Sequence, residues 1–160
     1  MFVPNKERRR KHLQTENPTI PANVLVCVTD QPSCRRLILA GDAIAKKYNM
    51  PVKVVTVLKP GLVSPKTAEV LQTLYNIAGR LGAEMTVLFN DSPLLTIAVH
   101  ARQTNAAHIV GGSSPSSESS PFIETLKGLL PEIPISIVDE EEQIITFPAF
   151  AAHQDERSYV

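Results

Sequence analysis

Short apolar runs rich in β-branched residues alternate with amphipathic stretches along most of the chain. Five such runs occur, at Val24–Thr29, Val52–Leu58, Glu84–Phe89, His108–Val110 and Ile135–Val138. They are nearly continuous rather than alternating in polarity, which is typical of strands covered on both faces in a parallel sheet. The pattern therefore predicts five strands joined by four helices.

The stretches between the runs carry helical periodicity and helix-end signals. From Ser33 to Tyr48, apolar residues recur at spacings of three and four, which predicts one amphipathic helix. Each later helix is predicted to start at a serine N-cap followed by proline, at Ser64-Pro65, Ser92-Pro93 and Ser120-Pro121. Gly82 and Asn105 stand where left-handed helix ends are expected. With right-handed crossovers, this order predicts a three-layer α/β/α sandwich.

Length and charge narrow the class of protein. The chain has 160 residues and 43% hydrophobic content, enough for one core and too little for two ordinary domains. Lys plus Arg equals Asp plus Glu at 16 each, so no strong nucleic-acid-binding signal exists. No apolar run approaches the ~18 residues of a transmembrane segment, and the first residues lack the apolar region of a secretory signal. We therefore expect a cytoplasmic protein with no transmembrane segment.

Motifs for catalysis or metal binding are absent from the sequence. Neither GxGxxG, GxxxxGK[ST], HExxH nor GxSxG occurs, and the histidines show no metal-ligand spacing. Cys27 and Cys34 fall in apolar surroundings without a third ligand, so we expect reduced packing residues. His108 enters the fourth strand and is expected to be a hydrogen-bonded structural residue. The chain is predicted not to be an enzyme and to hold no metal.

Three segments, Val24–Ser33, Asp91–Ser113 and Pro134–Val138, resemble the universal stress protein family. The resemblance is closest to the universal-stress-protein (UspA-like) domain of KdpD-type potassium-sensor histidine kinases and covers about residues 24–139. It implies a five-stranded parallel sheet of order 3-2-1-4-5 in a Rossmann-like fold similar to the adenine nucleotide alpha hydrolases. It also implies frequent homodimers and a regulatory or adenine-nucleotide-binding role.

The sequence departs from the nucleotide-binding pattern of that family. Such members close the first strand with an acidic residue, where this chain has Thr29 followed by Asp30. They also carry Gly, two residues, Gly, nine residues, Gly and Ser or Thr after the fourth strand. With Gly111 as the first glycine, the remaining positions are held by Ser114, Glu124 and Thr125. Glycine lets the backbone approach a phosphate, so we expect ordinary ATP binding to be lost.

Candidate ligand-binding residues lie where the predicted strands end, because α/β proteins bind ligands at that edge of the sheet. They are Thr29, Asp30, Val57, Gly111, Gly112, Ser113, Ser114, Ser120 and Thr125. Asp30 is expected either to hold a ribose or adenine amino group or to cap the helix near Ser33. The candidate ligands are ATP or AMP, or a smaller anion such as phosphate at the helix start after Ser120. Two alternatives for the serine-rich loop are a solvated surface segment and a set of phosphorylation sites.

The two ends of the chain differ from the domain between them. Residues 1–22 are predicted to form a basic disordered arm, residues 23–139 the universal-stress-protein-like domain, and residues 140–160 a C-terminal extension. The extension carries Ile144, Ile145 and Phe147, so it is expected to pack on its own domain or on a dimer partner. Otherwise the fifth strand would leave an exposed edge.

Three function classes follow. The first is a non-catalytic regulatory or protein-interaction module in stress or potassium/osmotic signalling, a homodimer working with a sensor kinase or another signalling protein. The second is a sensor of an adenine nucleotide or cyclic dinucleotide. The third is a nucleotide hydrolase, for which the sequence contains no visible nucleophile-base pair.

Overall fold

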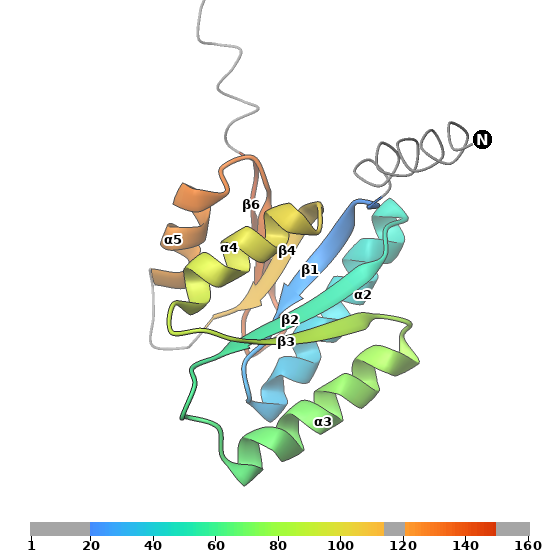
Figure 1. Cartoon of the computed structure of the whole chain (residues 1–160). Helices are drawn as coiled ribbons and strands as arrows, with labels where there is room; N and C mark the ends of the chain where they lie inside the picture. Colours follow the sequence, from blue (N-terminus) through green and yellow to red (C-terminus); the bar gives the residue numbers. More distant parts are fainter. Residues whose placement is uncertain (1–19, 114–120, 150–160) are drawn as a thin grey trace, which may run out of the picture.

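The apolar runs form the strands of a sheet flanked by helices in a computed structural model that describes residues 20–113 and 121–149 (Figure 1). The strands are β1 (Asn23–Cys27), β2 (Val52–Leu58), β3 (Glu84–Phe89), β4 (Ala106–Gly112), β5 (Ile135–Val138) and β6 (Ile144–Phe147). The helices are the short 3₁₀ helix η2 (Pro32–Cys34), α2 (Arg35–Tyr48), α3 (Pro65–Arg80), α4 (Pro93–Gln103) and α5 (Pro121–Leu129).

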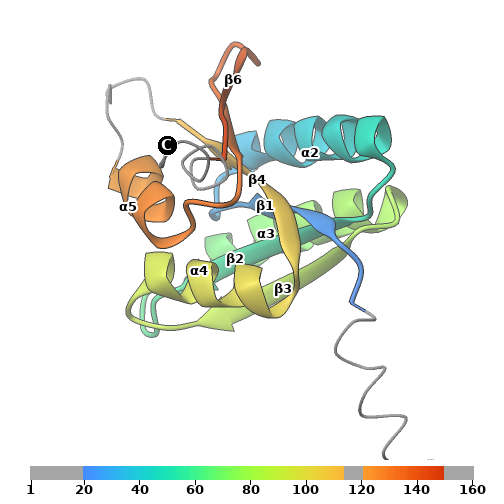
Figure 2. The ribbon, with the colours of Figure 1, turned by 90° about the horizontal axis from the view of Figure 1, so that it is seen from above.

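The sheet has the order β3-β2-β1-β4-β5-β6. Strands β1 to β5 pair in parallel and β6 pairs antiparallel with β5. Helices α2 and α3 lie on one side of the sheet, and α4 and α5 lie on the other (Figures 1 and 2). The predicted three-layer sandwich and the order 3-2-1-4-5 are confirmed, with a sixth strand added at the β5 edge.

The hydrophobic core has two halves that share the central strand β1. Val24 and Val26 pack beneath α2 and α3, whereas Leu25 and Cys27 pack beneath α4 and α5. Every residue of β1 is buried. The apolar runs are continuous because both faces of the central strands are covered.

The predicted helix ends are confirmed in part. The Ser64 hydroxyl caps α3 by accepting the Thr67 N–H, as predicted. Ser92 precedes α4, but its side chain makes no cap bond; its N–H instead donates to Oδ1 of Asn90. Ser120 lies outside the described residues. Gly82 and Asn105 have φ angles of 76° and 63°, which confirms the left-handed ends. No helix in the described part of the chain is long and apolar enough to cross a membrane.

Strand β6 was not predicted, because an acidic run precedes it. Asp139 organises the turn, since its Oδ1 accepts the N–H groups of Glu141 and Gln143. Glu142 adopts a φ of 64°, which reverses the chain. The segment 144–147 thus pairs with β5 of its own chain and covers that edge of the parallel sheet.

A chain of polar side chains ties the last three strands together. Nε2 of the buried His108 lies 2.8 Å from Oγ of Ser136, and that oxygen lies 2.8 Å from Oγ1 of Thr146. His108 therefore has the hydrogen-bonded structural role expected for it. Its location in a packed sheet makes protonation of its ring unfavourable.

We expect stability to fall as the pH drops below neutrality, partly because of His108. Burial lowers the pKa of His108 from 6.5, so the unfolded chain takes up a proton that the folded chain resists. Stability present above pH 6.5 is then lost toward the folded pKa, by at most about 1.4 kcal/mol per pH unit for one proton. Urea unfolding at several pH values measures this effect. The free energy of unfolding should depend less steeply on pH in His108→Gln, because the glutamine side chain does not titrate.

The matched variant for this measurement is His100→Gln. Burial, followed by nearby Lys53, lowers the pKa of His100 as well, while Glu84 opposes the shift. Each single variant should therefore reduce the pH dependence of the free energy of unfolding, and the double variant should reduce it further. An unchanged slope in His108→Gln would contradict the assignment.

Candidate functional site

A pocket of about 490 Å³ opens at the carboxyl edge of the parallel strands. It lies where the ends of β1, β2 and β4 meet the first turns of α2 and α4, beside α5. This is the edge at which open α/β sheets bind ligands, near the reversal of strand order between β1 and β4. Its apolar walls include Val28, Val57, Leu94, Ile97 and Phe122. The volume and apolar lining are typical of a small-molecule site.

Hydroxyl and thiol groups supply part of the polar lining. The backbone N–H of Thr29 donates to Sγ of Cys34 at 3.3 Å, and the Thr29 hydroxyl lies 3.4 Å from the same sulfur. These contacts close the turn between β1 and α2. Cys27 also lines the pocket, and burial raises the pKa of its thiol to about 12, so the thiol stays protonated. Both cysteines are free and buried.

Arg36 is a charged residue of the pocket wall, and the protein itself engages its guanidinium. Nε donates to the carbonyl of Asp139 at 2.8 Å, one terminal nitrogen to Ser33 at 2.9 Å, and the other to Val138 at 3.3 Å. Arg36 thereby joins the start of α2 to the end of β5. Glu140, which also lines the pocket, adds a carboxylate to the same region.

The two glycines that end β4 make room for side chains. A Cβ on Gly111 would lie 2.6 Å from Cε2 of Phe122, and one on Gly112 would lie 3.3 Å from the Arg36 guanidinium. In the nucleotide-binding pattern, glycine after the fourth strand lets the backbone come close to a phosphate. In the folded chain, packing against Phe122 and Arg36 is sufficient to require it at Gly111 and to favour it at Gly112.

Asp30 points to a neighbouring helix start. Its Oδ2 accepts the Thr67 hydroxyl at 2.7 Å, and Thr67 is also held by the Ser64 cap of α3. The alternative that Asp30 caps the helix near Ser33 is wrong, because neither η2 nor α2 has a side-chain cap. The carboxylate lies near the N-terminus of α3, where a negative charge is favourable.

The sequence candidates separate into three groups. Lining the pocket are Thr29, Val57, Gly112 and Ser113. Among the described residues, Asp30, Gly111 and the exposed Thr125 are not part of its lining. Ser114 and Ser120 lie outside the described residues. Sequence reasoning missed the contributions of Cys34, Arg36, Leu94, Phe122 and Glu140, although Arg36 and Phe122 sit in first helical turns after strands β1 and β4.

The titratable side chains that line the pocket are Cys27, Cys34, Arg36 and Glu140. No histidine is among the described residues that line the pocket. Across residues 20–113 and 121–149, no cluster of three or more His, Cys, Asp or Glu side chains is suited to a metal ion. The arrangement favours binding of a partly apolar ligand.

The fold is that of solved universal stress proteins. A universal stress protein from Archaeoglobus fulgidus aligns with a TM-score of 0.56 and 20% identity over 71% of this chain and 90% of its own. A universal stress protein in complex with cAMP aligns with a TM-score of 0.60 and 16% identity over 76% of this chain and 99% of its own. A universal stress protein from Archaeoglobus fulgidus in complex with dAMP aligns with a TM-score of 0.52 and 21% identity, over 68% of this chain and 90% of its own. No protein-family profile matches the chain, and no curated protein is found similar to it. The chain therefore shares the three-layer fold of universal stress proteins.

Proposed function

We propose that this protein is a non-catalytic regulatory module that recognises an AMP-sized adenine nucleotide in the strand-end pocket. The observation that carries this proposal is the pocket itself, with apolar walls suited to a base and few free charges.

The charge of the pocket favours a monophosphate over a triphosphate. Arg36 directs a donor from each of its three nitrogens to backbone carbonyls, which leaves it less able to hold a phosphate chain. Glu140 would repel additional phosphate charge. A nucleoside carrying one phosphate brings less charge and more apolar surface.

The solved neighbours support the same ligand class by analogy of fold. Two of them are in complex with cAMP and dAMP, each of which contains adenine and a single phosphate. A cyclic dinucleotide is the alternative ligand, on the basis of the sequence resemblance to potassium-sensor domains. That resemblance also supports a role in stress or potassium/osmotic signalling beside a sensor kinase.

A thermal-shift panel with AMP, cAMP, ATP and a cyclic dinucleotide tests the ligand. We expect AMP or cAMP at 100 times its Kd to add about 2.7 kcal/mol, which raises Tm by roughly 5 to 10 °C. ATP at equal concentration should shift Tm less. No shift with any nucleotide, or a larger shift with ATP, would contradict the proposal.

Two tryptophan variants locate the binding. Ser113→Trp places an indole in the pocket and should abolish the shift, whereas Thr125→Trp adds the same side chain at an exposed position outside the pocket lining. We expect Thr125→Trp to respond like the unchanged protein. Equal losses in the two variants would place binding elsewhere.

A further inference from the structure

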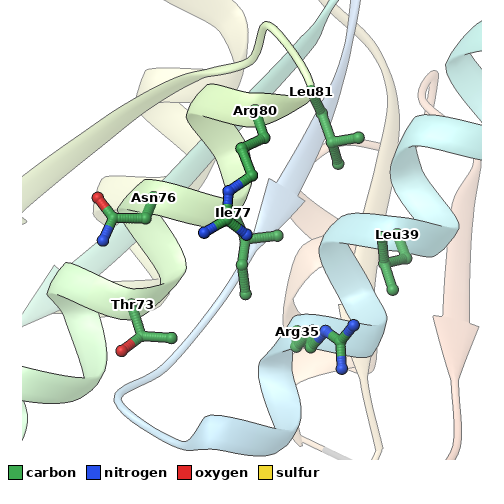
Figure 3. Close-up of a pocket in the computed structure, with 7 residues that line it drawn as sticks. All are labelled: Arg35, Leu39, Thr73, Asn76, Ile77, Arg80 and Leu81. Carbon is green, nitrogen blue, oxygen red and sulfur yellow. The ribbon is translucent and has the colours of Figure 1, made fainter.

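A second hollow, of about 610 Å³, lies between side chains of α2 and α3 (Figure 3). We call it the α2–α3 groove. Its apolar part is formed by Leu39, Ile77 and Leu81, and Leu39 is 43% exposed. The groove shares no lining residue with the strand-end pocket among the described residues. It is therefore a separate surface of the molecule.

Two arginines flank this apolar surface. Arg35 belongs to α2 and Arg80 to the last turn of α3, and both side chains line the groove (Figure 3). Within the described ranges, neither guanidinium makes a hydrogen bond or ion pair, whereas each nitrogen of neighbouring Arg36 donates one hydrogen bond. Unpaired guanidinium groups beside apolar side chains suit a ligand that is both acidic and apolar.

Basic residues outnumber acidic residues on helices α2 and α3. Helices α2 and α3 carry the basic residues Arg35, Arg36, Lys46, Lys47, Lys66 and Arg80. Against these stand only Asp42, which pairs with Lys46 at 3.0 Å, and Glu69. Because the net charge of the chain is zero, acidic residues outnumber basic residues in the rest of the sequence.

Four consecutive acidic residues form the turn between β5 and β6, residues 139–142, which we call the acidic turn. Asp139 holds the turn together, and Glu140, Glu141 and Glu142 are exposed. Ile144 and Ile145 follow after Gln143 and are 47% and 61% exposed. Because the turn is already ordered, docking it would cost little conformational entropy.

We propose that the α2–α3 groove binds the acidic turn of a second copy of this chain. Exposed glutamates would meet Arg35 and Arg80, and an adjacent isoleucine would cover the apolar floor. The two surfaces match in charge sign and in apolar character.

The position of both surfaces around α2 supports a closed pair. Arg36 ties the acidic turn to the side of α2 that faces β5, while Arg35 lines the groove that faces α3. One chain therefore cannot bring its own turn into its own groove without losing the Arg36 bonds. Each copy offers one groove and one turn, so a two-fold arrangement satisfies both contacts at once.

Charge reversal tests the pairing in sedimentation velocity over a range of protein concentrations. The groove variant Arg35→Glu/Arg80→Glu and the turn variant Glu141→Arg/Glu142→Arg should each weaken self-association by at least about tenfold. Their equimolar mixture should restore a 1:1 dimer, because every groove then faces a turn of opposite charge. Raising the salt concentration should weaken both the unchanged dimer and the restored one.

The matched control is Lys47→Glu/Lys59→Glu, which reverses two exposed charges outside the groove. It should dimerise like the unchanged protein, and circular dichroism should show that all variants are folded. A monomer at every concentration would overturn the proposal in favour of a different acidic partner for the groove. A mixture that stays monomeric, or a control as disruptive as the groove variant, would also overturn it.

Discussion

Replacing Leu126 by alanine is expected to lower the free energy of unfolding by about 2 to 5 kcal/mol. The Leu126 side chain is fully buried in the core half beneath α4 and α5, where it packs with Ile97, Ile109 and Ile135. Truncation removes buried apolar surface and leaves a cavity that the surrounding strands cannot easily fill. Urea unfolding followed by circular dichroism measures the change.

The same helix provides the control for this substitution. Leu129 is 37% exposed, so Leu129→Ala should cost less than about 1 kcal/mol. Equal costs for the two variants would mean that α5 is not docked through Leu126.

Because α5 has only nine residues, its helical state depends on this packing rather than on propensity. Leu126→Ala should therefore also weaken the proposed nucleotide binding, since α5 carries Phe122 of the pocket wall.

Substituting leucine for Gly41 should destabilise the protein by about 2 kcal/mol or more. Gly41 is the point where α2 approaches β1, and a Cβ there would lie 2.3 Å from Cγ2 of Val26. Val26 is fully buried and β-branched, so its side chain has little freedom to move aside. The helix propensity gained on replacing glycine, about 1 kcal/mol, is smaller than the expected cost of overpacking.

Gly79 in α3 allows a comparison in which only propensity changes. A Cβ at Gly79 would meet nothing within 4 Å, so Gly79→Ala should raise stability by up to about 1 kcal/mol. Thermal unfolding of the two variants should thus move Tm in opposite directions. A stabilising Gly41→Leu would show that α2 packs against β1 less closely than the structure indicates.

Much of the architecture could be predicted because its signals are local. Continuous apolar runs indicate strands with two covered faces, and β1 is buried at every position. The Ser64 cap and the left-handed residues Gly82 and Asn105 act within one or two helical turns. Strand β6 escaped prediction because its turn depends on Asp139 bonding backbone groups inside an acidic run.

The candidate site was predictable in place but less so in composition. The strand ends indicated the edge of the sheet at which the pocket opens, and Thr29, Val57, Gly112 and Ser113 line that pocket. The role of Asp30 could not be read from its neighbours, since its partner Thr67 is 37 residues away. Phe122 entered the wall because α5 packs against Gly111, a contact that no local pattern encodes.

Local signals in the sequence were sufficient to predict the layers of this protein, the order of its strands and helices, and the sheet edge at which the pocket opens. Those properties follow from periodicity, capping and chain connectivity, which act over short stretches or through general rules of topology. The contacts of the charged residues and glycines, in contrast, became visible only in the folded chain. Arg36 donates to carbonyls up to 103 residues away, and Gly111 and Gly112 make room for side chains. Arg35 lines the α2–α3 groove without an ion pair to any other described residue. Such roles depend on distances between elements far apart in sequence, because a side chain binds whatever the folded chain brings within reach.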